Sequence, residues 1–256
     1  MRSVAPRALS AAAIRWWTLA ALVVLWEAAA WLFGDPAFVA PPSSVARAFV
    51  PTIFGDPKLT VAIGTALVEI VTAFVLAVIA GAIVGIAIGI TTIGRRSFFP
   101  FVLLLFGLPQ VTVLPLVILI FGLGPASRIA FGFTHGVLPI IVTTVSGMRS
   151  VSPLLLSSAR SMGASHAQVL RHIIFPTMVA SVFTGLRLAM SLTLLGVILA
   201  ELFVSSNGIG NYTQIFAETF KPASLYALIL VLALTAVALN ELAALIEKHF
   251  SRWKQT

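Results

Sequence analysis

The sequence has no cysteine and very few charged residues. Of its 256 residues, only 9% are charged, whereas 59% are hydrophobic. The absence of cysteine excludes disulfides, thiolate catalysis and cysteine-ligated metal sites. A soluble domain carries about 25% charged residues, so this chain has too few to surround an apolar core with a polar surface. The composition therefore predicts an integral membrane protein.

Sequence signatures of catalysis are also missing. No G-x-x-x-x-G-K-[ST] phosphate loop occurs, so we expect no ATP hydrolysis by that route. The four histidines lack metal-ligand spacing with carboxylates, and no HExxH or Ser-His-acid arrangement is recognisable. We therefore predict no catalytic residue, no metal site and no cofactor bound by this chain.

Six apolar runs are present, rich in Leu, Ile, Val, Ala, Phe and Gly. Runs of this composition favour membrane-spanning helices over an outer-membrane barrel. The predicted fold class is all-α, a polytopic membrane protein with six transmembrane helices. We divide the chain into a first helix with an outer loop, residues 1–59, and a core of five helices, residues 60–250. The runs cover residues 16–33, 60–93, 98–121, 129–148, 177–204 and 224–246.

The first run also bears comparison with a signal peptide, because arginines precede it and three alanines at 28–30 could form a cleavage site. Its length, the internal Glu27 and the tryptophans at its edges instead favour a retained spanning helix.

Basic residues are distributed unevenly around the six runs. Cytoplasmic segments carry an excess of Lys and Arg, and this excess appears here if both termini are cytoplasmic. The net charge of +8 is thereby explained without nucleic acid, which we exclude as a partner. The inner residues are then Arg2, Arg7, Arg15, Arg95, Arg96, Arg149, Arg160, Arg171, Lys248, Arg252 and Lys254. The outer residues are Arg47, Lys58, Arg128 and Lys221, and Arg187 lies within the fifth run.

Glycines recur at every fourth position in the second run, at Gly81, Gly85 and Gly89. This spacing places them on one helix face. Small residues there allow the backbone of a second helix to approach closely.

Prolines interrupt the third run at Pro100, Pro109 and Pro115, with Gln110 beside the second. Each proline removes an internal hydrogen bond and bends or breaks the helix. Bent helices of this kind often border a cavity.

Residues 159–176, ARSMGASHAQVLRHIIFP, form a polar segment between the fourth and fifth runs. Apolar residues recur in it at steps of three and four, which indicates an amphipathic helix. Gly163 suggests two short helices at an angle, and Pro176 marks entry into the fifth span. A helix lying on the membrane surface and a docking element both remain open from the residues alone. The inward positions are Ala159, Met162, His166, Val169 or Leu170, and Ile173.

The same segment resembles the cytoplasmic signature of binding-protein-dependent ABC importer permeases. In that signature, an E-A-A triplet is followed by three residues, a glycine, nine residues and I-x-L-P. This chain has the triplet Ser157-Ser158-Ala159, then Gly163, then IIFP at 173–176, with the same spacing. Serine replaces the glutamate and Phe175 replaces the leucine of the signature.

Other segments resemble the branch of this family that imports nitrate, sulfonates, taurine and thiamine precursors. Together they cover roughly residues 40 to 253. They are APPSSVARAF at 40–49, VLPLVILIFGLGPASRI at 113–129, TTVSGMRSVSPLL at 143–155, FTGLRLAMSLTLLGVILAEL at 183–202 and NGIGNYTQ at 207–214. We expect the last to be an outer turn that touches the solute-binding protein.

The resemblance implies the membrane-spanning permease subunit of an ABC importer in a bacterial inner membrane. It would move a small organic or anionic solute inward by alternating access, driven by separate ATPase subunits that bind the ATP. The other implied partners are a periplasmic or lipid-anchored solute-binding protein, a second permease copy in a homodimer, and membrane lipid. A cytoplasmic coupling helix would lie between the fourth and fifth spans, in region 150–176. The coupling residues implied are Ser157, Ser158, Ala159, Arg160, Met162, Gly163, Ala164, Ile173 and Pro176.

Four polar side chains within the spans are candidates for the translocation path or for a pair between helices. Glu69 and Arg187 lie at depths that can overlap, which predicts an ion pair with a structural role. Gln110 and His135 are the others, and we expect His135 to be a packing histidine. Glutamate at position 69 is more typical of relatives that handle thiamine precursors or heterocycles than of sulfonate permeases. Glu201 is predicted to be interfacial and solvated.

Two other classes of protein would show different features in the sequence. A stand-alone channel or ion-coupled secondary transporter would carry coupling carboxylates deep in the bundle and often an internal repeat. No convincing repeat is present, and Glu69 is the carboxylate that lies furthest from the ends of a predicted span. A membrane enzyme would need catalytic residues that the sequence lacks.

Overall fold

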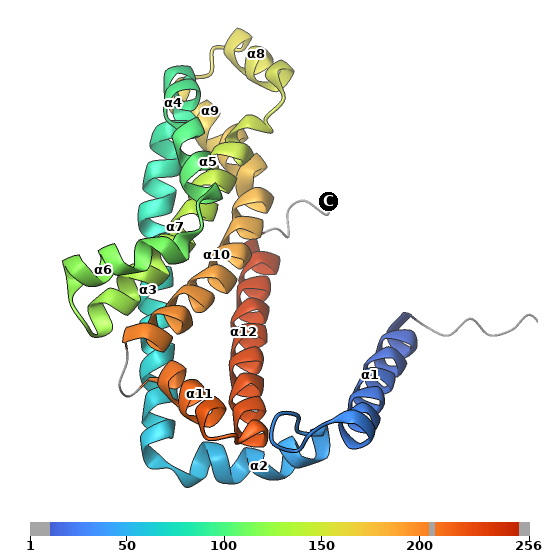
Figure 1. Ribbon diagram of the computed structural model, residues 1–256. Helices are drawn as coiled ribbons and strands as arrows, with labels where there is room; N and C mark the ends of the chain where they lie inside the picture. The colour runs from blue at the N-terminus through green and yellow to red at the C-terminus, as the bar shows by residue number, and fades with distance from the viewer. Residues whose placement is uncertain (1–10, 205–207, 251–256) are drawn as a thin grey trace, which may run out of the picture. The chain divides into compact units, whose positions relative to one another are not determined.

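The computed structural model describes residues 11–204 and 208–250, and every regular element in these ranges is a helix (Figure 1). The predicted all-α fold is confirmed. Arg2, Arg7, Arg252 and Lys254, which we assigned to the cytoplasmic side, and Asn207 lie outside these ranges. The helices are α1 (Ala11–Phe33), α2 (Pro42–Gly55), α3 (Pro57–Ile90), α4 (Thr92–Ser97), α5 (Phe99–Gly107), η1 (Gln110–Val113), α6 (Leu114–Phe121), α7 (Pro125–Arg149), α8 (Pro153–Ser161), α9 (His166–Val169), η2 (Leu170–Ile174), α10 (Phe175–Val204), α11 (Ile209–Glu218) and α12 (Pro222–Phe250).

Five uninterrupted helical stretches of the described chain are long and apolar enough to cross a membrane. They are α1, α3, α7, the continuous stretch from α9 through α10, and α12. The third predicted run is instead two limbs, Thr92–Gly107 and Gln110–Phe121, that meet at 92°. Pro109 lies at the break and Leu108 before it is extended, as expected when a proline ring excludes the preceding residue from the helical region. Counted as one span, the bent pair completes the six predicted.

The chain forms two compact units. The first comprises residues 1–60 and 213–231, and the second comprises residues 61–212 and 232–256. In the first unit, the carboxylate of Glu27 on α1 accepts hydrogen bonds from the Ser43 amide at 2.9 Å and from the Ser43 hydroxyl at 2.7 Å. The indole of Trp31 donates to the same carboxylate at 2.8 Å. The acidic residue of the first span is thus satisfied by the start of α2.

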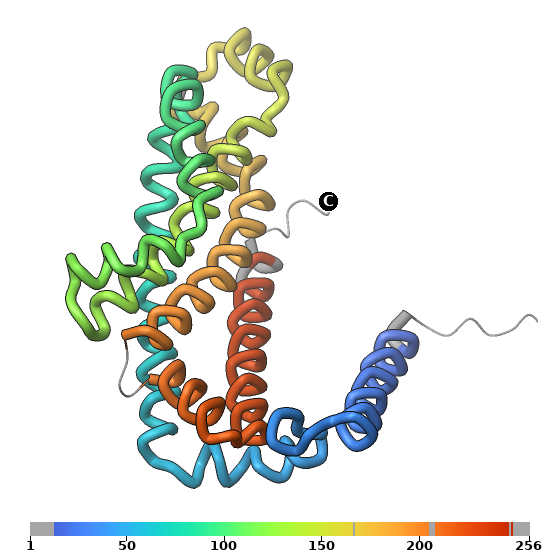
Figure 2. Tube along the Cα trace, in the orientation of Figure 1, coloured from blue at the N-terminus to red at the C-terminus, as the bar shows by residue number. Residues whose placement is uncertain are grey.

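Helices α3, α7 and α10 form the core of the second unit (Figure 2). Ala77 of α3, Ile140 of α7 and Ala189 of α10 belong to one buried cluster. Phe131 of α7 is fully buried, and the short helix α6 packs against it through Leu114. Within the second unit, α5, α6 and α10 therefore all pack against α7.

The glycine face of α3 packs directly on α7. A Cβ atom placed on Gly81 would lie 2.8 Å from the Cβ of Ile140, and one placed on Gly85 would lie 2.8 Å from the Cβ of Thr144. Gly89 faces Met148 in the same way. These partners also recur every four residues, so the predicted close approach of a second helix is confirmed and that helix is α7.

Candidate functional site

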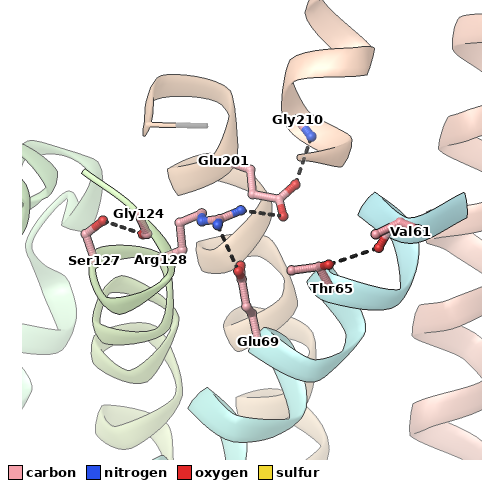
Figure 3. Close-up of polar contacts among 8 residues, drawn as sticks. All are labelled: Val61, Thr65, Glu69, Gly124, Ser127, Arg128, Glu201 and Gly210. Atoms are coloured by element: carbon pink, nitrogen blue, oxygen red, sulfur yellow. Dashed lines mark hydrogen bonds and ion pairs between the residues drawn. The ribbon is translucent and has the colours of Figure 1, made fainter. Parts of the chain in front are cut away.

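A buried cluster of charges joins three membrane helices of the second unit (Figure 3). Arg128 on α7 lies between two carboxylates, with one guanidinium nitrogen 3.0 Å from Glu69 on α3 and another 3.4 Å from Glu201 on α10. The exposed fractions of Glu69, Arg128 and Glu201 are 2%, 8% and 0%. The second carboxylate oxygen of Glu201 accepts a hydrogen bond of 2.9 Å from the amide of Gly210. We call these three side chains the ionic cluster.

The start of α7 places Arg128 within this cluster. Pro125 occupies the first helical turn, where its missing amide hydrogen costs least, and the Ser127 hydroxyl donates to the Gly124 carbonyl at 2.9 Å. Arg128 therefore lies in the first turn of the helix, where the helix dipole disfavours a cation. The two carboxylates compensate for this, and Gly210 at the start of α11 supplies a helix N-terminus that favours the anion of Glu201.

The predicted pairing of Glu69 with Arg187 is wrong. Glu69 pairs with Arg128, and Arg187 on α10 pairs with Glu247 on α12. Counting depth along two helices gives their relative height but not which faces meet. The sequence did hold a signal for Arg128, because Pro125 after a glycine marks a helix start four residues earlier than the apolar run predicted.

The prediction that Glu201 is interfacial and solvated is also wrong. Its side chain is fully buried between Arg128 and the Gly210 amide. The apolar run alone gave no indication that the chain returns after α10 and brings the Gly210 amide to Glu201. The segment from 209 is moreover a helix, α11, where we expected an outer turn.

The Arg187–Glu247 pair gives a direct test of the observed pairing. We expect Arg187→Glu to lower the yield of folded protein, because it opposes two carboxylates on α10 and α12. Adding Glu247→Arg should restore the yield measured by size-exclusion chromatography in detergent. The double variant Arg187→Glu with Glu69→Arg should not restore the yield. The structure would be contradicted if this double variant recovered the yield and Arg187→Glu with Glu247→Arg did not.

The two remaining polar candidates lie in different surroundings. His135 on α7 is buried, and its Nδ1–H donates to the Phe131 carbonyl at 3.0 Å while the two rings meet edge to face. The Nδ1 atom of His135 is thus satisfied by the backbone of its own helix. Gln110 begins η1 at the break of the third span, and its side-chain oxygen is buried without a hydrogen-bond partner among the described residues.

The polar segment between α7 and α10 forms two short helices, α8 and α9, joined at a glycine. Gly163 has φ +81°, a left-handed conformation that glycine adopts without cost. The Gly163 amide donates to Arg160 and the Ala164 amide donates to Ala159, both at 3.0 Å. These two bonds make a Schellman C-cap that ends α8. The predicted break at Gly163 is confirmed, and we call α8, this turn and α9 the bracket.

A capping box then begins α9. The Ser165 amide donates to the side chain of Gln168 at 2.8 Å, and the Gln168 amide donates back to the Ser165 hydroxyl at 3.3 Å. A π-helical turn, η2, leads into α10, whose second residue is Pro176. The end of α8 and the start of α9 are therefore both capped by residues of the bracket itself, and Pro176 lies at the helix entry predicted for it.

Burial divides the bracket into an inner and an outer side. Ala159 and Val169 are buried as predicted. Met162, which we also assigned to the inner side, is 82% exposed, because the Schellman turn rotates it outward. Ser157, Ser158 and Arg160 are exposed, and Ala164, Ile173 and Pro176 are half-buried. A shallow groove of about 400 Å³ follows the turn, lined by Ala159, Met162, Gly163, Ala164, Gln168, Val169, His172 and Ile173.

Sequence comparison matches residues 73–255 to a family described as binding-protein-dependent transport system inner membrane component. The taurine transport system permease protein TauC of Escherichia coli is 29% identical over 93% of this chain and 85% of its own length. The riboflavin transport system permease protein RibX of Chloroflexus aurantiacus is 30% identical over 93% of this chain and 88% of its own. The fold is similar to a solved structure of the MetNI methionine ABC transporter, with a TM-score of 0.65 and 14% identity over 75% of this chain and 95% of that one.

Proposed function

Because the chain belongs to the family of binding-protein-dependent transport system inner membrane components, we propose that its bracket is the surface through which separate ATPase subunits drive inward transport. The chain is the membrane-spanning permease subunit of an ABC importer and is not itself an enzyme. In this proposal, ATP-dependent movement of the ATPase moves α8 and α9, and η2 passes that movement to α10.

The observation that carries this proposal is the exposure of large apolar side chains on the bracket. Leu154, Leu155 and Met162 are 73%, 53% and 82% exposed, although Ser157, Ser158 and Arg160 around them are polar. Apolar side chains rimmed by polar ones are typical of surfaces that pack on another protein. Since the cap and the capping box fix the backbone, docking would cost little ordering entropy.

We infer that the solute is a small organic or anionic compound, in the range of sulfonates, taurine, nitrate and thiamine-precursor-like compounds. The two relatives of nearly equal identity are named for taurine and for riboflavin, which supports selection chiefly by a separate solute-binding protein. That protein would be periplasmic or lipid-anchored. A second copy of the permease in a homodimer would complete the pathway, with both termini cytoplasmic.

For the polar residues within the spans, we propose two different roles. Glu69 and Arg187 would hold helices together, since each lies in an ion pair with a neighbouring helix. His135 would serve packing alone. Gln110 would face the solute, because its buried oxygen lacks a partner among the described residues at the break in the third span and a bent helix can border a pathway.

Gly163 provides the experiment on the bracket. A Cβ at this position would meet no atom within 4 Å, so any effect of a substitution comes from the backbone. Valine disfavours the left-handed conformation by about 1–2 kcal/mol or more, whereas asparagine tolerates it. In proteoliposomes with the ATPase and the solute-binding protein, we expect Gly163→Val to lower solute-stimulated ATP hydrolysis about tenfold and Gly163→Asn to stay near wild type.

Met162→Glu tests the same surface without touching the backbone. It should weaken association with the ATPase in a pull-down while leaving the permease folded, because it introduces a charge at an apolar contact. Full transport by both Gly163→Val and Met162→Glu would refute the assignment. Solute uptake by the permease alone, without nucleotide or partners, would instead support a stand-alone channel or secondary transporter.

A further inference from the structure

A cavity of about 550 Å³ lies beside the bracket, at the end of the second unit where Figure 1 also shows α4 and α8. Three arginines from three different helices line it, namely Arg95 of α4, Arg149 of α7 and Arg160 of α8. The Arg95 guanidinium donates to the Gly89 carbonyl oxygen and to the Thr92 hydroxyl, which holds it at the wall of the cavity. Its volume is within the range of small-ligand sites.

Among the residues that the structure describes, no acidic side chain lines this cavity. The sequence contains neither Asp nor Glu between Glu69 and Glu201, so the helices that build the cavity supply no carboxylate of their own. A general excess of arginine at the cytoplasmic end follows from membrane topology. Topology does not require arginines of α4, α7 and α8 to line one cavity, where their like charges repel one another.

We propose that this cavity binds the phosphate group of an anionic ligand. Guanidinium groups form charge-assisted, often bidentate hydrogen bonds with phosphate. The rest of the wall is largely apolar, with Met148, Val151, Leu156, Leu170 and Ile174. A ligand that carries a phosphate group on an apolar part of its structure fits this mixed lining. Basic pockets between membrane helices on the cytoplasmic side bind lipid head groups. The phosphate can come from an anionic phospholipid or from a soluble phosphate compound.

Binding at this place would link the bracket to the membrane helices. Arg160 and Leu156 belong to α8, Arg149 ends α7 and Arg95 belongs to α4. An anion held by all three arginines would therefore fix the position of α8 relative to α4 and α7. This inference does not depend on which solute is transported or on which protein docks on the bracket.

The experiment measures thermal unfolding of the full-length permease in lipid nanodiscs, without ATPase or solute. The three conditions are phosphatidylcholine alone, phosphatidylcholine with inorganic phosphate, and phosphatidylcholine mixed with phosphatidylglycerol. A ligand at about 100 times its Kd should raise the unfolding midpoint by about 5 °C. A rise with inorganic phosphate identifies a soluble phosphate, and a rise with phosphatidylglycerol alone identifies a lipid head group.

Two double variants distinguish the cavity from general charge attraction. Arg149→Gln with Arg160→Gln should abolish the rise, whereas Arg96→Gln with Arg171→Gln, which removes the same charge outside the cavity lining, should keep it. Ile174→Trp keeps all three arginines but fills the cavity, and it should also abolish the rise. The proposal is overturned if neither probe raises the midpoint, or if both double variants lose the rise equally while Ile174→Trp keeps it.

Discussion

Arg128→Met should leave little or no folded permease in detergent extracts. Removing the arginine leaves Glu69 and Glu201 facing one another in a site where both are buried. Breaking a buried ion pair by removing one partner costs about 3–5 kcal/mol, and a whole domain is stable by only about 5–15 kcal/mol. Folded yield, measured by size-exclusion chromatography of the expressed protein, checks this expectation.

The control for this variant removes all three charges together. The triple variant Arg128→Met, Glu69→Gln and Glu201→Gln should recover most of the folded yield, because replacing a buried charge cluster with neutral groups of similar size is often close to neutral in stability. In Glu201→Gln, the side-chain amide oxygen can still accept the hydrogen bond from the Gly210 amide that Glu201 accepts now. Wild-type yield for Arg128→Met alone would show that the cluster does not hold α3, α7 and α10 together.

Gly85→Leu should produce the other large loss, by separating α3 from α7. Even the first carbon of a side chain at this position would lie 2.8 Å from the Cβ of Thr144, and 3.3 Å from the Cα of Ile141. Overpacking a well-packed interface typically costs about 1–3 kcal/mol, and backbone contacts leave little room for relaxation here, so we expect about 3 kcal/mol or more. The midpoint of thermal unfolding in detergent measures the effect.

The same helix contains a matched control. A Cβ at Gly64 of α3 would meet nothing within 4 Å. Gly64→Leu therefore makes the same chemical change on the same helix without a clash, and it should leave the unfolding midpoint unchanged or slightly raised. Equal losses in Gly85→Leu and Gly64→Leu would mean that glycine is needed in α3 for some reason other than its contact with α7.

The features that the sequence alone predicted depend on residues that are close together along the chain. The six apolar runs, the four-residue spacing of Gly81, Gly85 and Gly89, and the break near Pro109 all depend on neighbours along one helix. The break at Gly163 and the entry at Pro176 are equally local. The importer family was predicted from the spacing of the segment around Gly163, and the family profile agrees.

What the sequence did not reveal depends on how helices are rotated against one another. Glu69 pairs with Arg128 rather than with Arg187 because of the way in which α3, α7 and α10 are rotated about their axes. The spacing of residues along the chain does not determine this rotation. Burial of Glu201 requires the chain to fold back so that Gly210 reaches it. Met162 points outward because it lies in the Schellman turn that ends α8, where the regular helical spacing used for the prediction no longer applies.

Two contacts between α3 and α7, the glycine face and the Glu69–Arg128 ion pair, also limit how this subunit can move. The glycine face at residues 81–89 interlocks the helices toward one end, and Arg128 ties them to each other and to α10 toward the other. No one of these three can slide along its neighbours without breaking a buried contact. We therefore expect a route for solute to open by pivoting of the block as a whole, with bending at its margins, such as the proline break before Gln110.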